Sequence, residues 1–332
     1  MEYKAIIDKA KKGDFDNVYL LHGEEPYYID LICDAIVANA LREEERDFNQ
    51  SILYGRDIDA GSLIAELKAY PMMAERRLVV LREAQDMKGI EDLEPYFDNV
   101  TSSTVFVICH KYKNVDSRKN VFKKAAKAGT TYKSVKIPDY KLADWIIMQV
   151  RASGYGITEK AAVLLTEFLG NDLARITNEL DKLYLLVEKG TTINDVHIEE
   201  NIGISKDYNF FELSNAVGSR NVLKAFTIVD YFVHNPKAGP LVPVVSNLYR
   251  LFKNLMIIHF LENKSKESVA SALKVHPFVA TQLMGAAKIY PPKKVASNIH
   301  LLHEYDLKSK GIGNSGFEDG ELMKELVYQL MH

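Results

Sequence analysis

A short segment of the chain, residues 18–30, constrains the fold most strongly because it combines an apolar run, a glycine and a helix start. It reads Val-Tyr-Leu-Leu-His-Gly-Glu-Glu-Pro-Tyr-Tyr-Ile-Asp, which predicts a buried strand, a sharp turn at Gly23 and a helix that begins at Pro26. A strand, a glycine turn and a helix in this order form the layout of a phosphate-binding loop.

The residues that carry phosphate chemistry in such a loop are missing here. In the pattern G-x-x-x-x-G-K-[ST], the first Gly is Gly23. The second Gly, the Lys and the Ser/Thr then fall on Tyr28, Ile29 and Asp30. The chain therefore lacks the ammonium that reaches a phosphate and the hydroxyl that binds magnesium, and the two glutamates after Gly23 would repel a polyphosphate. We interpret the segment as a degenerate phosphate loop that binds no nucleotide, and we expect no cofactor.

A second feature of ATP-hydrolysing proteins is also absent. In these proteins an apolar strand is followed by an Asp that holds magnesium. Here the apolar residues 78–81 are followed by Arg82 and then Glu83, so a positive charge stands where a metal ligand belongs. The two losses argue against ATP hydrolysis by this chain. An active AAA+ ATPase remains the alternative from the enzyme class, and the missing Lys at Ile29 is the residue that discriminates against it.

Apolar runs and helical patterns alternate over the first 139 residues. Five apolar runs predict strands at residues 18–21, 51–54, 78–81, 105–109 and 131–137. Helical patterns separate them at residues 27–41, 60–70, 91–99 and 117–128. Short apolar strands that alternate with helices predict an α/β domain, residues 1–139, whose parallel sheet is covered on both faces.

The strand pattern stops after the Ile137-Pro138-Asp139 break, and helical patterns follow to the end of the sequence. We predict a small helical domain over residues 140–207 and an all-helical domain over residues 208–332. The fold class is therefore α/β plus all-α.

The composition is that of an ordinary soluble globular protein. Apolar residues make up 47% and charged residues 26% of the 332 residues, and the net charge of −3 does not indicate a free nucleic-acid binder. No apolar run approaches the roughly 20 residues of a membrane helix. The N-terminus lacks the apolar core of a signal peptide. We expect a cytoplasmic protein that does not contact a membrane.

The spacing of cysteines and histidines indicates neither a metal site nor a catalytic centre. Cys33 and Cys109 are far apart in sequence and no C-x-x-C occurs, which argues against a zinc ribbon and a disulfide framework. His300 and His303 are three residues apart on a predicted helix, but no further ligand with known spacing accompanies them. We expect no metal and no catalytic residues.

The segment Leu-Lys-Ala-Tyr-Pro-Met-Met-Ala, residues 67–74, holds candidate binding residues. Pro71 disfavours a helical conformation of Tyr70, so Tyr70, Met72 and Met73 fall in a connection after the helix. Two adjacent Met residues cannot both face one core, and the flexible, polarisable Met side chain suits an adaptable binding surface. The alternative from the residues alone is that one or all of these side chains pack beneath the following strand.

Residues 111–136 include nine Lys and Arg residues and one acid, Asp116. Lys119, Lys123 and Lys127 are spaced four residues apart and would form one ridge of the predicted helix. Such a ridge could follow a phosphate backbone without reading bases. A solvated helix face is the alternative for this site, and a stand-alone DNA-binding protein is the alternative function that the ridge suggests.

Short motifs in all three predicted domains carry a family resemblance. They are Val-Tyr-Leu-Leu-His-Gly-Glu-Glu at residues 18–25, Arg-Arg-Leu-Val-Val-Leu at 76–81, Gly-Asn-Asp-Leu at 170–173, Asn-Glu-Leu-Asp-Lys-Leu at 178–183, Val-His-Pro-Phe-Val at 275–279 and Tyr-Asp-Leu-Lys-Ser at 305–309. In their order and spacing they resemble the delta subunit of bacterial DNA polymerase III, the clamp-loader subunit that opens the sliding clamp. The resemblance covers nearly the whole chain.

The resemblance implies a fold plan and a set of partners. The family is built like an AAA+ protein, with a nucleotide-type α/β domain, a helical lid and a helical collar, which correspond to residues 1–139, 140–207 and 208–332. The family's first domain does not use ATP, which agrees with the degenerate loop. The collar would hold the chain in a hetero-oligomer with the ATPase and other subunits of the clamp loader.

The resemblance also implies a function for the connection after the second helix of the α/β domain. In the family this connection carries apolar residues that enter a pocket on the sliding clamp, and by position these are Tyr70, Met72 and Met73. Family members often have Leu-Phe at the last two places, where this chain has Met-Met. The implied function is that of a clamp-opening subunit of the DNA polymerase III holoenzyme, a nucleotidyltransferase, in DNA replication. The lysine ridge would touch primer-template DNA only within the assembled loader.

Overall fold

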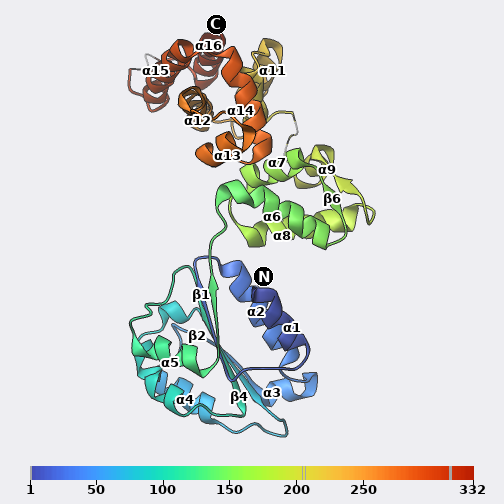
Figure 1. Ribbon diagram of the computed structural model, residues 1–332, viewed down its shortest axis with the longest axis vertical. Coiled ribbons are helices and arrows are strands. Elements are labelled where there is room, and N and C mark those ends of the chain that lie inside the picture. Colours follow the sequence, from blue (N-terminus) through green and yellow to red (C-terminus); the bar gives the residue numbers. More distant parts are fainter. Residues whose placement is uncertain (1, 204, 206, 314–315) are drawn as a thin grey trace. The chain divides into compact units, whose positions relative to one another are not determined.

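The structure is a computed structural model that describes residues 2–203, 205, 207–313 and 316–332 (Figure 1). The chain divides into two compact units, Met1–Ile137 and Pro138–His332. The first unit contains a parallel sheet with covering helices, and the second is almost entirely helical.

The first unit is built on a sheet of five parallel strands in the order β2-β3-β4-β1-β5. The strands are β1 (Val18–Gly23), β2 (Gln50–Tyr54), β3 (Arg77–Arg82), β4 (Thr104–His110) and β5 (Thr130–Ser134). Every residue of β1 and β4 is buried, because central strands of a parallel sheet are covered on both faces. The five predicted strands and the predicted α/β class are confirmed.

Helices and 3₁₀ helices (η) connect the strands, and their bounds differ in places from the predicted ones. They are α1 (Glu2–Lys11), α2 (Pro26–Asn39), η1 (Glu43–Glu45), α3 (Arg46–Asn49), α4 (Ala60–Lys68), η2 (Ala84–Asp86), η3 (Ile90–Asp98) and α5 (Asn120–Ala128). The helix predicted over residues 117–128 begins only at Asn120, so Lys119 is its N-cap residue. The helix predicted over residues 60–70 already ends at Lys68. The segment predicted over residues 91–99 is a 3₁₀ helix, Ile90–Asp98, with Pro95 inside it; the proline ring clashes with the carbonyl group four residues earlier in an α-helix.

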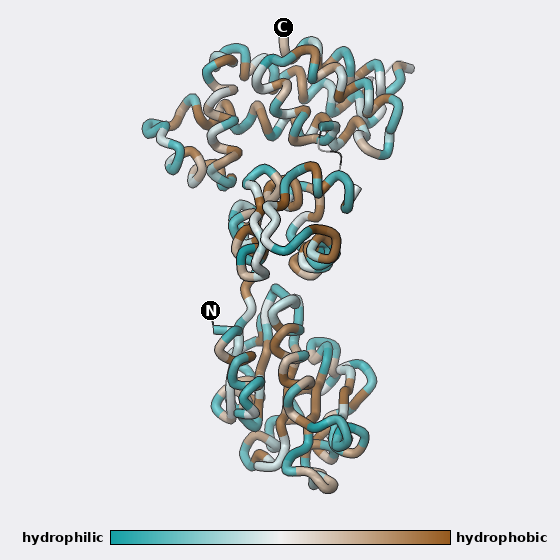
Figure 2. Tube along the Cα trace, turned by 90° about the vertical axis from the view of Figure 1, so that its right-hand side faces the viewer, coloured by the Kyte–Doolittle hydropathy of each residue, from teal (hydrophilic) through white to brown (hydrophobic). Residues whose placement is uncertain are grey.

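The helices of the first unit cover both faces of its sheet. α4, η3 and α5 lie on one face, where they share a hydrophobic core with Val18 and Leu20 of β1. Side chains alternate along a strand, so Tyr19 and Leu21 point to the opposite face. α2 contacts β1, β4 and β5, and α1 packs beside α2. In Figure 2, hydrophobic segments (brown) run through the middle of this unit.

The second unit contains helices α6 to α16 and one short strand pair. The helices are α6 (Asp139–Ala152), α7 (Glu159–Leu169), α8 (Leu173–Leu186), α9 (Asp195–Ile202), α10 (Phe210–Gly218), α11 (Val222–His234), α12 (Leu241–Phe260), α13 (Lys266–Leu273), α14 (Pro277–Ile289), α15 (Pro292–Ser309) and α16 (Asp319–Met331). β6 (Gly156–Ile157) and β7 (Thr192–Ile193) form a parallel pair. The helical domain predicted over residues 140–207 thus includes a strand pair that the sequence pattern does not reveal, because strands of two residues are too short to produce an alternating pattern.

The long helix α12 belongs to the hydrophobic core of helices α10 to α16. It contacts α10, α14, α15 and α16, and its buried side chains include Leu248, Phe252 and Leu255. Within the described residues, α12 alone has the length and apolar composition that could span a membrane, and half of it is buried inside the unit.

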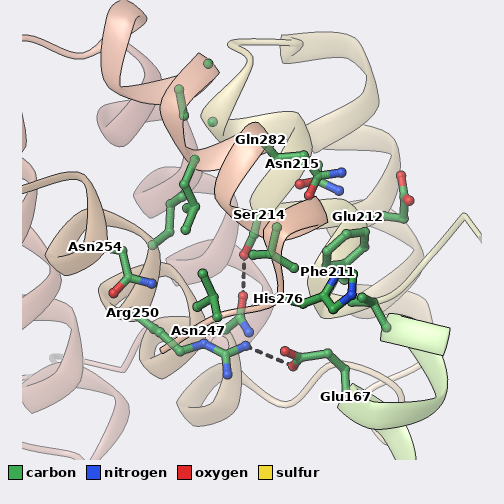
Figure 3. Close-up of a pocket in the computed structure, with 18 of the residues that line it drawn as sticks. Glu167, Phe211, Glu212, Ser214, Asn215, Asn247, Arg250, Asn254, His276 and Gln282 are labelled. Carbon is green, nitrogen blue, oxygen red and sulfur yellow. Dashed lines mark hydrogen bonds and ion pairs between the residues drawn. The ribbon is translucent and has the colours of Figure 1, made fainter. Parts of the chain in front are cut away.

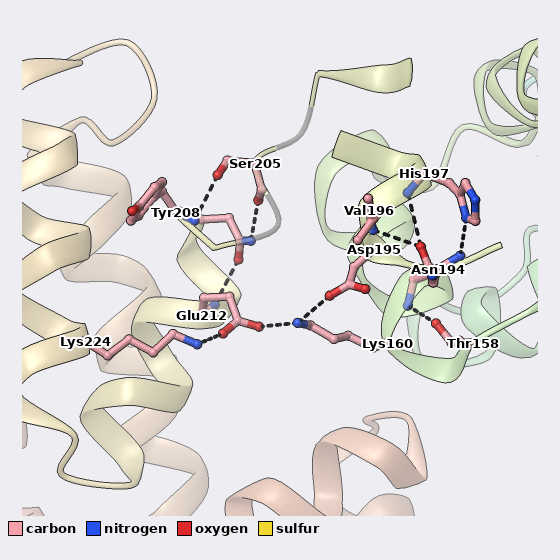
Figure 4. A network of polar contacts seen from close by, with 12 residues as sticks. Thr158, Lys160, Asn194, Asp195, Val196, His197, Ser205, Tyr208, Glu212 and Lys224 are labelled. Carbon is pink, nitrogen blue, oxygen red and sulfur yellow. Dashed lines mark hydrogen bonds and ion pairs between the residues drawn. The ribbon is translucent and has the colours of Figure 1, made fainter. Parts of the chain in front are cut away.

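A series of ion pairs links helices within the second unit (Figure 4). Lys160 of α7 lies 2.8 Å from Asp195 of α9 and 3.2 Å from Glu212 of α10. Glu212 is buried and also pairs with Lys224 of α11. Burial acts to lower the pKa of Lys160, but hydrogen bonds and charges from Asp195 and Glu212 outweigh burial and raise that pKa. Lys160 is therefore charged at neutral pH, and the ion pairs join α7 and α9 to α10 and α11.

Candidate functional site

The degenerate phosphate loop connects β1 to α2. Gly23 has a φ of 141°, and a side chain at this position would meet the carbonyl oxygen of Ser134 in β5 at 1.9 Å. Only glycine tolerates this approach. The main-chain N–H of Glu24, which could otherwise face a bound anion, donates to the same carbonyl oxygen at 3.0 Å. The loop is thus closed by the protein's own main chain.

The side chains at the next two motif positions are core residues. Ile29, at the position of the phosphate-binding Lys, is fully buried. Tyr28, at the position of the second Gly, is buried too, and its ring centre lies 4.7 Å from that of Tyr3 in α1. The segment therefore packs α1 and α2 together at the place where a phosphate-binding loop leaves room for a ligand.

Asp30, the last motif position, contacts a buried ammonium group at the carboxyl edge of the sheet. Lys111 directly follows β4, is only 7% exposed, and places Nζ 2.8 Å from Asp30 Oδ1 and 3.2 Å from Glu83 Oε1. Burial acts to lower the pKa of Lys111, but the hydrogen bonds and charges of the two carboxylates outweigh burial and raise it. In an active ATPase, the loop hydroxyl and an acid after the third strand hold magnesium. Here carboxylates near those positions hold a lysine.

Two buried histidines lie at the same edge, side by side in the register of β1 and β4. Burial, followed by the charges of His110 and Lys133, lowers the pKa of His22 to about 4. Burial likewise lowers the pKa of His110. His22 Nδ1 accepts a hydrogen bond from the Val115 N–H at 3.4 Å, which requires this nitrogen to be unprotonated. Both imidazoles are therefore neutral at pH 7.

The connection between α4 and β3 presents three large apolar side chains to solvent. Tyr70, Met72 and Met73 are 86%, 58% and 98% exposed. None of them packs beneath β3, so the core-packing alternative does not hold. Met73 has a φ of 53°, in the left-handed region that residues with a side chain rarely adopt. A cluster of exposed apolar side chains is typical of a protein-binding surface.

Asn49, the last residue of α3, holds the main chain of Met72. Its Oδ1 accepts from the Met72 N–H at 2.7 Å, and its Nδ2 donates to the Met72 carbonyl oxygen at 2.9 Å. Asn49 is fully buried, whereas the neighbouring Phe48 is exposed. Neither residue belongs to a local sequence pattern, and the contact of Asn49 joins positions 23 residues apart.

Arg77, the first residue of β3, joins the elements at the base of this connection. Its guanidinium pairs with Glu66 of α4 and donates to Ser51 Oγ at 3.2 Å and to the Phe48 carbonyl oxygen at 3.1 Å. The hydrogen bond from Arg77 is the main cause that lowers the pKa of Glu66. Arg77 of β3 therefore connects α3, α4 and β2 beside the exposed residues.

The predicted lysine ridge is shorter than expected. Lys119 lies at the N-cap of α5 and pairs with Glu91 of η3. Lys123 and Lys127 lie within α5 and are exposed. In the part of the chain that the structure describes, neither of them forms an ion pair. Two free lysines thus remain on this face as candidates for a phosphate contact.

The described residues bring no set of metal ligands together. Across residues 2–203, 205, 207–313 and 316–332, no group of three or more His, Cys, Asp or Glu residues could hold a metal ion. Cys33 and Cys109 are buried and form no disulfide. His300 is exposed and lies 3.4 Å from Glu304 on the same helix.

The second unit contains a cavity of about 600 Å³ (Figure 3). Two pairs of ionisable side chains lie at this cavity. Arg250 Nη2 lies 2.9 Å from Glu167 Oε2, and His276 Nε2 lies 3.2 Å from Asp144 Oδ1. These two contacts engage part of the polar lining of the cavity with other side chains of the second unit.

Comparisons with known proteins find relatives along most of the chain. The family model described as DNA polymerase III, delta subunit, matches residues 19–136, and the model of that subunit's C-terminal domain matches residues 207–327. The DNA polymerase III subunit delta of Bacillus subtilis (strain 168) is 26% identical over 335 residues, which cover 97% of this chain and 94% of that protein. The solved structure of the Bacillus subtilis DNA clamp loader delta protein has a TM-score of 0.56 and 23% identity, and the match covers 99% of each chain.

Proposed function

Because the chain belongs to the DNA polymerase III delta subunit family, we propose that it binds the sliding clamp and opens it, so that the clamp can be loaded on primed DNA during replication. The observation that carries this proposal is the exposed cluster of Tyr70, Met72 and Met73 on an irregular connection. Large apolar side chains in that setting are anchors for a hydrophobic pocket on a partner.

The proposed mechanism is a difference in affinity between two states of the clamp. Full burial of a side chain such as Met contributes roughly 1.5–3 kcal/mol. A partner that binds the open ring more tightly than the closed ring shifts the ring toward the open state by that difference. The chain itself needs no covalent step to do so, and we propose no catalytic residue in it.

Several features support a chain that opens the clamp without using ATP itself. The position of the phosphate-binding Lys is the buried Ile29, and the loop N–H of Glu24 is bonded to β5. Lys111 fills the site where carboxylates could otherwise hold a cation. We propose that ATPase subunits of the loader supply the timing, and that they expose this chain to the clamp in the cytoplasm.

The remaining domains have proposed functions of their own. We propose that residues 140–207 form the lid and residues 208–332 the collar that holds the subunits of the loader together. The large core of α10 to α16 supports a stable helical collar. Lys123 and Lys127 are proposed to contact primer-template DNA within the assembled loader, where neighbouring subunits would add to their weak individual contribution.

Replacement of the two methionines tests the proposed anchor. Met72→Ala together with Met73→Ala is expected to weaken clamp binding by about 2 kcal/mol or more, close to 30-fold in Kd. The two shorter side chains would bury less apolar surface against the clamp. Met148→Ala, at an exposed methionine of α6, is the matched control and should bind as the unmodified chain does. Isothermal titration calorimetry gives both affinities, and circular dichroism checks the fold. An unchanged Kd in a folded double variant would remove these residues from the site.

A further inference from the structure

We infer that Asn49 is a positioning residue, which holds the clamp-binding connection, residues 70–76, in its exposed conformation before the clamp arrives. The inference rests on the proposed function, since it assigns Asn49 to the same binding site. Asn49 is fully buried. It therefore acts through the main chain of Met72 and does not touch the clamp.

The side-chain oxygen and both N–H groups of Asn49 form hydrogen bonds, two with Met72 and one with Glu45. Oδ1 accepts from the Met72 N–H at 2.7 Å, and one Nδ2 hydrogen goes to the Met72 carbonyl oxygen at 2.9 Å. The other Nδ2 hydrogen goes to the Glu45 carbonyl oxygen at 3.0 Å. Both main-chain groups of Met72 are thus satisfied by one side chain, in the way that a neighbouring strand would satisfy them.

Asn49 makes two long-range hydrogen bonds near the middle of this connection, and Arg76 makes another at its end, from Nη1 to the Gly13 carbonyl oxygen at 3.3 Å. Residues 70–76 lie outside the helices and strands that the structure describes, and Pro71 has no N–H to donate. Main-chain hydrogen bonds flank the connection at Ala69, which donates to Glu66 at 3.3 Å, and at Arg77, which donates to Ser103 at 2.8 Å. Between these points the contact to Met72 lies close to the middle of the connection.

The conformation at Met73 shows why such a tie is needed. Its φ of 53° is unfavourable for a residue with a side chain, so surrounding contacts must impose it. With Met72 fixed, the chain direction into Met73 is fixed as well, and the Met73 side chain points to solvent with 98% exposure. A segment that is ordered before binding loses less conformational freedom when the partner binds. Asn49 therefore strengthens clamp binding without contacting the clamp.

Asn49→Ala is the direct test, with Asn39→Ala as the matched control. Asn39 is an exposed asparagine of the same unit whose Nδ2 donates to the Ala35 carbonyl oxygen at 2.7 Å. We expect Asn49→Ala to weaken clamp binding about tenfold and Asn39→Ala to leave it unchanged. Hydrogen exchange should accelerate in residues 70–76 of the Asn49→Ala variant while β3 keeps its protection. An affinity equal to that of the Asn39→Ala control would overturn the inference.

A double-mutant cycle separates positioning from general destabilisation. If Asn49 acts through the connection, Asn49→Ala should have a much smaller effect on clamp affinity in the Met72→Ala, Met73→Ala background, where Tyr70 is the remaining anchor. A tenfold loss in that background too would contradict the positioning role. If the methionine variant itself binds with full affinity, the proposed assignment of the methionines to the clamp-binding site fails. If only the Asn49 variant retains full affinity, this inference alone fails.

Hydrogen exchange of the unmodified chain decides the matter even if Asn49→Ala does not fold. The Met72 amide, which donates to Asn49, should exchange at least tenfold more slowly than the Met73 amide. Equal exchange rates at the two positions would overturn the inference.

Discussion

Lys111 shows at the scale of a residue how this chain fills a nucleotide-type site with its own groups. Its ammonium lies between Asp30 and Glu83, which approach the positions of magnesium-binding groups in an active ATPase. Ile29 replaces the lysine that would reach the phosphate, and it is buried. The site therefore does not stand empty, since an internal ion pair and core side chains occupy it.

Removal of the Lys111 charge is expected to destabilise the first unit. Lys111→Met leaves Asp30 and Glu83 close together without a counter-ion, at a cost of about 2 kcal/mol. This is below the roughly 3–5 kcal/mol of a fully buried pair, because both carboxylates are partly exposed. Lys9→Met, at an exposed position of α1, is the control. Urea unfolding followed by circular dichroism measures the difference.

Neutralisation of both carboxylates provides the matching rescue. Asp30→Asn with Glu83→Gln should recover most of the stability that Lys111→Met loses, because no unpaired charge then remains. Equal stability of Lys111→Met and the control variant would show that the ion pair contributes nothing.

His22 predicts a pH dependence of the same unit. Its pKa is lowered from 6.5 to about 4 on folding, so the unfolded chain binds the additional proton between these values. The stability contribution is present above pH 6.5 and is lost as the pH falls toward 4, with an upper limit of roughly 3 kcal/mol. The lowered pKa of His110 acts in the same direction.

A variant isolates this contribution. His22→Asn should reduce the loss of stability between pH 7 and pH 4.5. The stability is measured as the urea concentration at the midpoint of unfolding of β1. Pulse-labelling hydrogen exchange at one fixed labelling pH gives that midpoint separately from the second unit. A pH profile as steep as that of the unmodified chain would contradict the assignment to His22.

Local patterns predicted few of the contacts made by individual residues. The degenerate motif was readable because its positions lie within a short stretch. The contacts of Lys111 with Asp30 and of Asn49 with Met72 could not be predicted from the sequence. Each contact joins residues that only the folded sheet brings together. The exposure of Tyr70, Met72 and Met73 was left open by the residues themselves, since the same pattern suits packing beneath a strand.

At the scale of secondary-structure elements, the sheet was the most predictable part of the molecule. Its strands are buried on both faces, so each one produces a continuous apolar run. Helix starts were less predictable. α5 begins at Asn120 because Lys119 has extended backbone angles, a detail that the lysine spacing does not reveal. The pair β6–β7 is too short to leave any periodic signal.

The exposed lysines of α5 give a prediction at this scale. Lys123→Glu with Lys127→Glu should reduce clamp loading on primed DNA by the complete loader, because repulsion replaces attraction to the phosphate backbone. Clamp affinity in the absence of DNA should be unchanged. Lys9→Glu with Lys12→Glu near α1 is the control. A loading assay with unaltered yield for the α5 variant would exclude a DNA contact there.

The whole molecule combines a nucleotide-type α/β unit with a helical unit. Both family models match along the chain, one in each unit, and a structure of the same family covers 99% of it. The resemblance read from short motifs thus identified the family correctly. The further division of the second unit into lid and collar, and the partners that each would contact, stay proposals.

At this scale the rival functions differ from the proposed one in what the chain needs in order to act. An active ATPase would require nucleotide, and a stand-alone DNA-binding protein would bind DNA with a steep salt dependence and ignore the clamp. A clamp-opening subunit should bind the clamp through its own exposed apolar residues. Its affinity should not depend on a nucleotide, because the loop that would bind one is closed by Ser134 and Ile29.

Calorimetric titration of the purified chain with its sliding clamp, in buffer without nucleotide, is the decisive test of the proposed function. We predict saturable binding that is unchanged by added ATP and magnesium. No binding without nucleotide, or binding that appears only when ATP is added, would contradict the proposed function.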